Sequence, residues 1–341
     1  MAAAMTAAAA SWRVAIPVGE IAPRPAPQGG RVRTLSGLTM GTTWSVRFVG
    51  SDAGEQMLGR LIPRALDRMV AQMSPWEPDS DLGRFNRLPP DSWQTLPPEF
   101  AGVIGCAIRI ARESDGAYDP TVGALVDLWG FGPGGQRQTP PPADAVARDL
   151  VACGWRHLDF DAAARRLRRH HAGPLDLCGI AKGFAVDLVM EVLREHRIHH
   201  ALVEIGGELS GRGVKPDGSP WWVEIDAPAR SSAPPMLVAL HDLAIATSGV
   251  ERGFASGAQH YSHTLDPRSG RPIDNGMVAA TVLHRSCMEA DAYATALMVK
   301  GPDAAIEFAA AHRLAALICF RRDGDDTISE RTTPALDAML A

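Results

Sequence analysis

A run of ten residues near the middle of the chain combines two glycines, a lysine and a change of hydrophobic pattern. It reads Leu175-Asp176-Leu177-Cys178-Gly179-Ile180-Ala181-Lys182-Gly183-Phe184 and passes from an apolar strand into an amphipathic helix. Such a turn presents backbone amides and carbonyls at a helix N-terminus, where a phosphate or its metal can bind. Lys182 would add a point charge for the phosphate, although the spacing is not that of the loop G-x-x-x-x-G-K-[ST]. A plain strand-to-helix connection with a surface lysine is the alternative.

A carboxylate and a hydroxyl lie four residues apart in Ala290-Asp291-Ala292-Tyr293-Ala294-Thr295-Ala296. A helix would place Asp291 and Thr295 on one face, among small apolar residues that indicate partial burial. A buried carboxylate needs a partner or a metal, and oxygen ligands suit Mg²⁺, which completes its shell with water and substrate phosphate. The alternative is a carboxylate favoured by the helix dipole, with Thr295 bonding back to a carbonyl.

Two histidines precede a tight turn at Asp266-Pro267-Arg268-Ser269-Gly270. His263 could act as a general base, because an unperturbed histidine has a pKa of about 6.5. Zinc binding by His260 and His263 has little support, since the sequence has no H-E-x-x-H and no third ligand nearby. A purely structural histidine is the alternative.

Two further segments carry glycines after predicted strands. Glu204-Ile205-Gly206-Gly207-Glu208 reads first as a turn and second as a ligand loop. Thr247-Ser248-Gly249 follows the apolar residues 243–246 and offers hydroxyls and amides at a strand end. Neither segment is specific by itself.

Helices and strands are both needed to position these groups. Alternating residues predict a strand from Thr43, and helical spacing predicts helices over 54–73 and 100–111, with loops between Asp115 and Pro142. The later predictions are a helix from Ile180, strands at 201–205, 221–225, 236–240 and 277–284, helices near 288–299 and 302–312, and a hairpin turning at Asp323-Gly324. Because no regular βαβ rhythm appears, we expect an α+β fold of two intimately packed lobes, built of antiparallel or mixed sheet with flanking helices.

Composition excludes several classes of protein. The chain has 341 residues, 46% of them hydrophobic and 21% charged, which is typical of a globular protein with a large core. Its 34 basic and 39 acidic residues give a net charge of −5, which argues against a basic nucleic-acid-binding surface. No apolar run approaches the length of a transmembrane segment. The five cysteines form no C-x-x-C pair and suggest neither a disulfide framework nor a zinc knuckle.

The first 32 residues are rich in alanine and proline and are expected to form a flexible tail (1–32) before one folded domain (33–341). A secretory signal would place positive charge before an apolar stretch, but here residues 2–10 are mostly alanine and precede the first arginine, Arg13. No cysteine precedes Cys106 that could carry a lipid anchor. A cytoplasmic location is therefore favoured, with an atypical export signal as the alternative.

These segments and several others together resemble the FAD:protein FMN transferase family, also called ApbE-like flavin transferases. The early landmarks are Met40-Gly41-Thr42-Thr43, Met73 to Ser80 with Arg84-Phe85-Asn86, and Tyr118 to Gly123 with Leu128-Trp129-Gly130-Phe131-Gly132. The later ones are Gly179 to Gly183, Val203 to Glu208, Ala246 to Gly249, Tyr261-Ser262-His263 with Asp266-Pro267, and Ala290-Asp291 to Thr295. Because they keep one order over residues 34–300, the resemblance is specific.

The resemblance implies an ApbE-like, T-fold-related architecture and a Mg²⁺-dependent reaction with FAD as substrate. The FMN moiety would pass to a Ser or Thr hydroxyl of an acceptor protein through a phosphoester bond, with release of AMP. Family acceptors carry a motif similar to Asp-Gly-x-Ser/Ala-Thr. Many members have a leader and act on the periplasmic side of the inner membrane, which is the alternative location for this protein.

The resemblance also implies roles for individual residues. The implied Mg²⁺ ligands are the backbone carbonyl of Gly179, the carboxylate of Asp291 and the hydroxyl of Thr295. The FAD pyrophosphate would lie at Lys182, and the other matching contact positions are Met40, Trp76, Asp119 and the backbone near Leu265. For catalysis, Lys182 would offset phosphoryl charge, and His263 is the first candidate for the base, with Asp291 as the second.

Two positions depart from the family pattern, and other functions remain open. Cys178 stands where serine is common, and Trp76 where tyrosine is frequent. A Mg²⁺-dependent FAD pyrophosphatase would use the same site with water in place of the acceptor hydroxyl. A non-catalytic FAD-binding carrier and a zinc hydrolase are further alternatives, the last with the least support.

Overall fold

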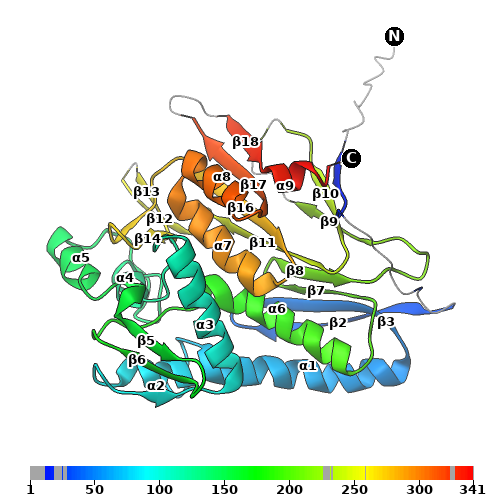
Figure 1. The fold of residues 1–341 in the computed structure, drawn as a ribbon, viewed down its shortest axis with the longest axis horizontal. Coiled ribbons are helices and arrows are strands. Elements are labelled where there is room, and N and C mark those ends of the chain that lie inside the picture. The colour runs from blue at the N-terminus through cyan, green and yellow to red at the C-terminus, as the bar shows by residue number, and fades with distance from the viewer. Residues whose placement is uncertain are drawn as a thin grey trace, which may run out of the picture.

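The computed structural model describes residues 12–18, 25, 29–225, 231, 233–257, 259–322 and 327–340. Helices lie on one face of a large antiparallel sheet, and smaller sheets complete the molecule (Figure 1). This arrangement is the predicted α+β class. Within the described ranges we find no helix with the length and apolar character needed to span a bilayer.

An eight-stranded antiparallel sheet forms the middle layer, in the order β18-β17-β16-β11-β8-β7-β3-β2. Its strands are β2 (Arg31–Thr39), β3 (Thr42–Gly50), β7 (Ala201–Ile205), β8 (Glu208–Arg212), β11 (Leu243–Gly249), β16 (Met277–His284), β17 (Ala315–Arg321) and β18 (Ile328–Thr332). Successive side chains point to opposite faces, so Val203 of β7 joins the core that contains the helices, whereas Leu202 joins a second core behind the sheet. Both faces of the sheet are therefore covered.

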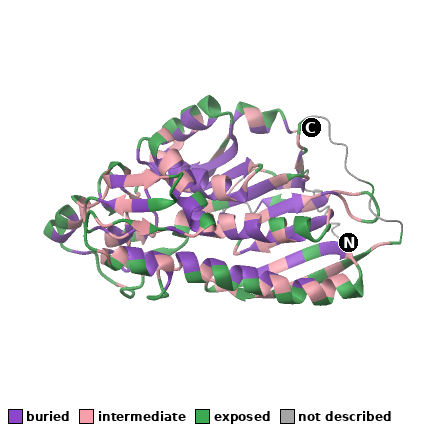
Figure 2. Ribbon diagram, turned by 60° about the horizontal axis from the view of Figure 1, so that its bottom comes forward, coloured by how far each residue is buried: buried purple, intermediate pink, exposed green. Residues whose placement is uncertain are grey.

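The helices that cover one face carry apolar residues at helical spacing. In α1, Leu58, Ile62 and Leu66 are buried, and the Ser51 hydroxyl accepts a hydrogen bond from the Gly54 N–H at its start. The larger helices are α1 (Asp52–Met73), α3 (Pro98–Glu113), α6 (Cys178–Glu195), α7 (Cys287–Lys300) and α8 (Pro302–Ala311). The shorter helices, not all of which lie on this face, are α2 (Asp81–Arg87), α4 (Gly123–Leu128), α5 (Ala143–Leu150), the 3₁₀ turn Trp155–His157 and α9 (Pro334–Asp337). Leu336 of α9 packs in the core behind the sheet. Figure 2 shows buried residues along the strands and on the helix sides that face them.

Among the described residues, four small sheets accompany the central one. They comprise β1 (Arg13–Ala15), β10 (Met236–Leu240) and β9 (Trp221–Ile225); β4 (Gln94–Thr95), β6 (Arg166–Arg169) and β5 (Leu158–Asp161); β12 (Gly253–Ser256) and β13 (Gln259–Ser262); and β14 (Leu265–Asp266) and β15 (Arg271–Pro272). Trp221 and Val238 of the first sheet pack in the core behind the central sheet. A third apolar cluster, which includes Trp129, Val146 and Leu265, joins α4 and α5 to the β12–β15 segment.

Each helix or strand predicted by residue range falls on an element of the structure, but the apolar segment before Cys178, expected as a strand, has no regular structure. Two further regions contain elements that were not expected. Arg13–Ala15 pairs in parallel with β10, and β2 begins at Arg31, so strands occur within the stretch (1–32) that was expected as a tail. The region expected as loops between residues 115 and 142 contains α4, whose six residues are too few for a helical pattern to stand out. The turn predicted at Asp323-Gly324 lies outside the described residues, and β17 and β18 on either side are antiparallel partners.

Candidate active site

A cavity of about 1230 Å³ lies where α6 begins, against β8, β11, α7 and the loops around β12–β14. Pockets for small molecules commonly measure about 300–1,000 Å³, so this one has room for a dinucleotide-sized ligand. It is lined by every residue expected at the site except one. The lining residues from that set are Trp76, Asp119, Gly179, Lys182, His263, Leu265, Asp291 and Thr295.

Met40 is the exception, because it is not among the described residues that line the cavity. It occupies the turn between β2 and β3 with a left-handed φ of 48° and packs against the main core. The same turn approaches the cavity through Thr42, since a Cβ atom on Gly206 would lie 2.9 Å from Thr42 Cγ2 and 3.5 Å from Lys182 Cδ. The predicted contact between Met40 and a flavin remains a prediction.

The beginning of α6 fits closely against α7. Gly179 has non-helical backbone angles (φ −87°, ψ 16°), and a Cβ atom there would lie 3.0 Å from Thr295 Oγ1. One turn later, the Gly183 N–H donates to Asp291 Oδ2 at 3.0 Å. Glycine at both positions therefore lets the two helices approach and brings the Asp291 carboxylate and the Thr295 hydroxyl to the α6 turn.

We expect Gly183→Ala to destabilise the protein strongly. A Cβ atom at this position would lie 2.3 Å from the Cys287 carbonyl oxygen and 2.8 Å from Asp291 Cβ, so α6 and α7 would have to separate. Overpacking of this kind typically costs about 1–3 kcal/mol. Urea unfolding would measure the change in the free energy of unfolding.

Gly102→Ala is the matched control, because Gly102 lies in α3 where an added Cβ atom would meet nothing within 4 Å. Alanine is a better helix former than glycine by roughly 0.5–1 kcal/mol, so this variant should be slightly more stable than the wild type. A Gly183→Ala protein as stable as the wild type would contradict the close approach of the two helices.

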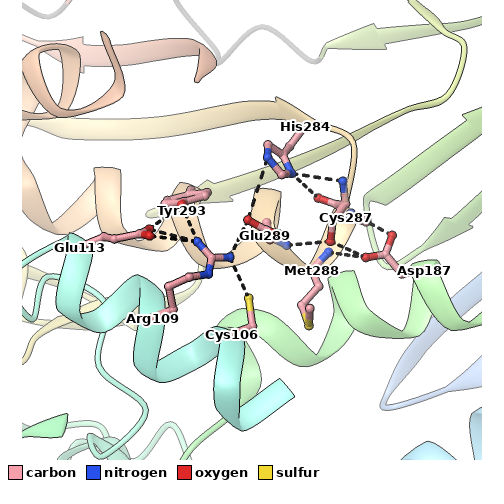
Figure 3. Close-up of polar contacts among 10 residues, drawn as sticks. Cys106, Arg109, Glu113, Asp187, His284, Cys287, Met288, Glu289 and Tyr293 are labelled. Atoms are coloured by element: carbon pink, nitrogen blue, oxygen red, sulfur yellow. Dashed lines mark hydrogen bonds and ion pairs between the residues drawn. The ribbon is translucent and has the colours of Figure 1, made fainter. Parts of the chain in front are cut away.

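The N-terminus of α7 is fixed by a carboxylate from α6. Asp187 accepts hydrogen bonds from the Cys287 N–H at 2.9 Å, the Met288 N–H at 3.0 Å and the Ser286 hydroxyl at 2.7 Å (Figure 3). These backbone donors have no partners within their own helix, so Asp187 satisfies them and adds negative charge at the positive end of α7. The helix that carries Asp291 is thereby tied to the helix that carries Lys182.

A second set of contacts ties α7 to α3. Arg109 of α3 donates to Tyr293 at 3.1 Å, pairs with Glu289 of α7 at 2.6 Å and pairs with Glu113 at 3.1 Å (Figure 3). The Tyr293 hydroxyl in turn donates to Glu113 at 2.6 Å. Both networks fix the rotation of α7, which decides whether Asp291 and Thr295 face the cavity.

Two buried carboxylates and one ammonium group form the charged wall of the cavity. Lys182 forms an ion pair with Glu208, which is 2% exposed. Asp291, the second acid, is 4% exposed. Burial, and then the negative charge of Asp291, raises the pKa of Glu208 to about 8. Burial also raises the pKa of Asp291, and the Lys182 charge opposes that rise. The wall carries one more negative than positive group when all three are ionised.

The donors in this wall suit a hard divalent cation. The Asp291 carboxylate, the Thr295 hydroxyl and the Gly179 backbone supply oxygen only, as Mg²⁺ prefers. Thr295 Oγ1 also lies 3.3 Å from Ser248 Oγ, so a further hydroxyl from the Thr247-Ser248-Gly249 segment is close. In the described part of the chain no three His, Cys, Asp or Glu side chains form a metal-binding cluster, so a zinc site at His260 and His263 lacks additional ligands there.

His263 lies in the cavity wall between β13 and β14. Its Nδ1 is 3.2 Å from the Arg252 carbonyl oxygen, and because a carbonyl can only accept, Nδ1 carries the proton and Nε2 holds the lone pair. The ring meets Phe131 edge-on, with 6.4 Å between centroids. Burial, together with the positive charges of Arg252 and Lys182, lowers the pKa of His263. The side chain is therefore neutral at neutral pH and has a free basic nitrogen.

The remaining predicted residues differ in how they meet the cavity. Trp76, with 55% of its surface exposed, is available for stacking against a ligand ring. Leu265 is buried in the third apolar cluster, which leaves its backbone as the group for a ligand. Both oxygens of Asp119 are engaged, by the Thr121 N–H at 2.9 Å and hydroxyl at 2.6 Å and by the Trp155 N–H at 2.8 Å, so this carboxylate shapes the cavity wall.

Sequence reasoning did not assign a role to Glu208 or Asp187. In the sequence, Glu208 belongs to a glycine-containing turn segment. The only feature that points to it is its position as an acidic residue at the start of the strand that follows the turn. Asp187 lies on the same helix as Lys182, in a sequence that gives no indication of α7 as its partner. Both residues act through contacts between segments far apart in the chain.

Comparison with known proteins gives consistent matches over most of the chain. A sequence model of the ApbE family matches residues 40–318. The FAD:protein FMN transferase of Vibrio cholerae serotype O1 is 36% identical over 85% of this chain and 87% of its own length, and that of Escherichia coli K12 is 33% identical over 86% and 85%. The crystal structure of the apo Pseudomonas stutzeri flavinyl transferase ApbE superposes with a TM-score of 0.84 at 36% identity, covering 91% of this chain and 97% of that one.

Proposed function

The chain belongs to the ApbE family, and from this premise we propose that it transfers the FMN moiety of FAD to a Ser or Thr hydroxyl of an acceptor protein, with Mg²⁺ as cofactor and AMP as the second product. The observation that carries the proposal is one cavity of dinucleotide size that holds Lys182, Asp291, Thr295 and a neutral His263 together. Curated relatives named FAD:protein FMN transferase support the transferase assignment.

The reaction is a displacement at the phosphorus atom of the FMN half of FAD. The acceptor hydroxyl oxygen forms a new bond to this phosphorus, and the bond from phosphorus to the bridging pyrophosphate oxygen breaks. That oxygen leaves with AMP. His263 Nε2 takes the hydroxyl proton, because Nδ1 already donates to the Arg252 carbonyl. Lys182 offsets negative charge on the phosphate oxygens, which increases in the transition state.

Gly179, Asp291 and Thr295 would hold the Mg²⁺, as the oxygen-only donor set allows. A bound divalent cation supplies positive charge for the phosphoryl and leaving oxygens. The residues themselves provide the rigid frame: α7 is fixed by Asp187 and Arg109, and the Gly183 N–H orients the Asp291 carboxylate. Trp76, Asp119, Met40 and the backbone near Leu265 would position the flavin nucleotide.

A direct assay separates transfer from hydrolysis. The purified protein is incubated with FAD, Mg²⁺ and a tagged peptide that carries an Asp-Gly-x-Ser/Ala-Thr motif, beside a peptide with valine in place of the threonine. We expect covalent flavin fluorescence on a denaturing gel for the threonine peptide only, with one AMP released per flavin attached. Free FMN and AMP without labelled peptide would instead identify a pyrophosphatase, and the absence of AMP would identify a carrier.

We expect Lys182→Ala to weaken FAD binding by about 10- to 100-fold, since hydrogen bonds to charged groups contribute about 1.5–3 kcal/mol. The substitution removes the cation and also leaves Glu208 without its ion-pair partner, so the wall loses the positive charge that faces the pyrophosphate. Quenching of flavin fluorescence measures the affinity. Lys215→Ala, at a lysine outside the cavity lining, is the control, and an unchanged FAD affinity for Lys182→Ala would rule out the phosphate role.

A further inference from the structure

Glu208 is held inside the cavity wall by the turn that precedes it. Gly206 and Gly207 have left-handed φ angles of 60° and 97°, which other residues rarely adopt, and β8 starts at the next residue. The Glu208 side chain is 2% exposed, and the residue lines the cavity beside Lys182 and Asp291.

The two carboxylate oxygens of Glu208 have different surroundings. Oε1 pairs with Lys182 Nζ, whereas Oε2 is buried and has no hydrogen-bond partner among the described residues. A buried acceptor without a partner is costly, and more so when it belongs to a charged group. A partner that enters the cavity is therefore needed to satisfy this oxygen.

The charges around Glu208 indicate what kind of partner fits. The negative charge of Asp291 on α7 repels that of Glu208. Lys182 of α6 is the single cation in contact with Glu208 in the described part of the chain. Arg252 is exposed, and its positive charge acts to lower the pKa of Lys182. The Cys287 thiol remains neutral, since burial raises its pKa. When Glu208 and Asp291 are both ionised, Lys182 compensates one of their two negative charges, and the remaining charge favours a cation over a neutral donor.

We propose that Glu208 supplies the second negative charge of the divalent-cation site, with Oε2 as an acceptor directed to the cation or its bound water. The proposal rests on the Mg²⁺ assignment of the proposed function. It adds an acidic group that neither the helix spacing of Asp291 and Thr295 nor the resemblance assigned. Partners in the outer coordination sphere typically change metal affinity by about 10- to 100-fold when they are replaced.

The test measures cation binding directly, with Mn²⁺ as the probe and no FAD present. Glu208→Gln keeps the size and an oxygen acceptor for Lys182 but removes the charge. We expect its Mn²⁺ dissociation constant, measured by electron paramagnetic resonance titration, to rise by about tenfold or more relative to the wild type. Glu204→Gln is the matched control. Glu204 lies in the neighbouring strand β7, outside the cavity lining, and accepts from the Gly207 N–H. This variant should bind Mn²⁺ like the wild type.

A parallel titration with FAD distinguishes a cation role from a purely anchoring role. If Glu208 only fixes Lys182, Glu208→Gln will lose FAD affinity and keep its Mn²⁺ affinity, and this result would overturn the proposal. Glu208→Asp, which keeps the charge, should bind Mn²⁺ more tightly than Glu208→Gln, and equal affinities would also overturn it. Thermal unfolding confirms that each variant is folded.

These outcomes are independent of the transfer assay. A wild-type protein that binds Mn²⁺ in a Glu208-dependent way but transfers no flavin would leave this inference standing and reject the proposed function. A protein that transfers flavin, and loses Mn²⁺ binding with Asp291→Asn but not with Glu208→Gln, would reject only this inference.

Discussion

Asp291→Asn is expected to reduce the rate of flavin transfer by about 10³-fold or more. Asparagine keeps the size of the side chain and an oxygen that can accept from the Gly183 N–H, so the α6–α7 contact should survive. It removes the carboxylate that would bind the cation. A metal ion contributes several kcal/mol to charge stabilisation in such reactions, and each 1.36 kcal/mol is about tenfold in rate.

Three measurements belong to this experiment: the initial rate of covalent labelling, the Mn²⁺ affinity and the melting temperature. The rate and the affinity should fall together, while the melting temperature stays near that of the wild type. Asp303→Asn is the control, since Asp303 is an exposed acid at the start of α8. Near wild-type transfer by Asp291→Asn in Mg²⁺ buffer would refute the metal assignment.

His263→Ala should slow transfer by about 10²- to 10⁴-fold, the usual contribution of a general base. The variant loses the Nε2 lone pair and the ring contacts with the Arg252 carbonyl and Phe131, whereas the hydrogen bond from the residue 263 backbone N–H to the Arg252 carbonyl remains. Because the hydroxyl of a threonine is a weak nucleophile, the remaining rate should depend on hydroxide and rise with pH. FAD affinity should change little, since the base acts on the acceptor.

The transfer rate of the wild-type protein should fall at low pH, because the base must be neutral to accept a proton. Burial lowers the pKa of His263 below its ordinary value of about 6.5, so the neutral base is present at pH 7 and is lost as the pH falls through the lowered pKa. The wild-type rate should therefore decline only below about pH 6.5, and this limb should be missing in His263→Ala.

His260→Ala is the control for the histidine experiment, because His260 is exposed, three residues earlier, and outside the cavity lining. It should transfer flavin at the wild-type rate. If His263→Ala were as active as this control, Asp291 would be the remaining candidate for the base.

Local patterns in the sequence predicted the longer helices and several of the strands, and they brought out Lys182, Asp291, Thr295 and His263 as candidates before the resemblance added the others. The 3.6-residue spacing of apolar side chains in α1 and α3, and the period of two in β3, are carried by the chain without reference to its neighbours. The glycine-containing turn before Lys182 and the four-residue spacing of Asp291 and Thr295 are local too. The order of landmarks identified the family, and the structure brings eight of the nine expected site residues to one cavity.

Short elements and the first strand could not be predicted in this way. Arg13–Ala15 is too short to show a period, and it is a strand because Met236–Leu240 offers it an edge. The six residues of α4 likewise depend on packing with α5 and the β12–β15 segment. Tertiary contacts, rather than local preference, decide such segments.

The way in which the charges meet is a property of the folded chain alone. Lys182 and Glu208 are 26 positions apart, and Asp187 and Cys287 are 100 apart, yet each pair is in contact. Burial leaves Glu208 with an oxygen that has no partner among the described residues, and it keeps His263 neutral. The cause is that pKa values and ion pairs depend on desolvation and on charges brought close by folding, and neither quantity is encoded in the spacing of residues along the chain.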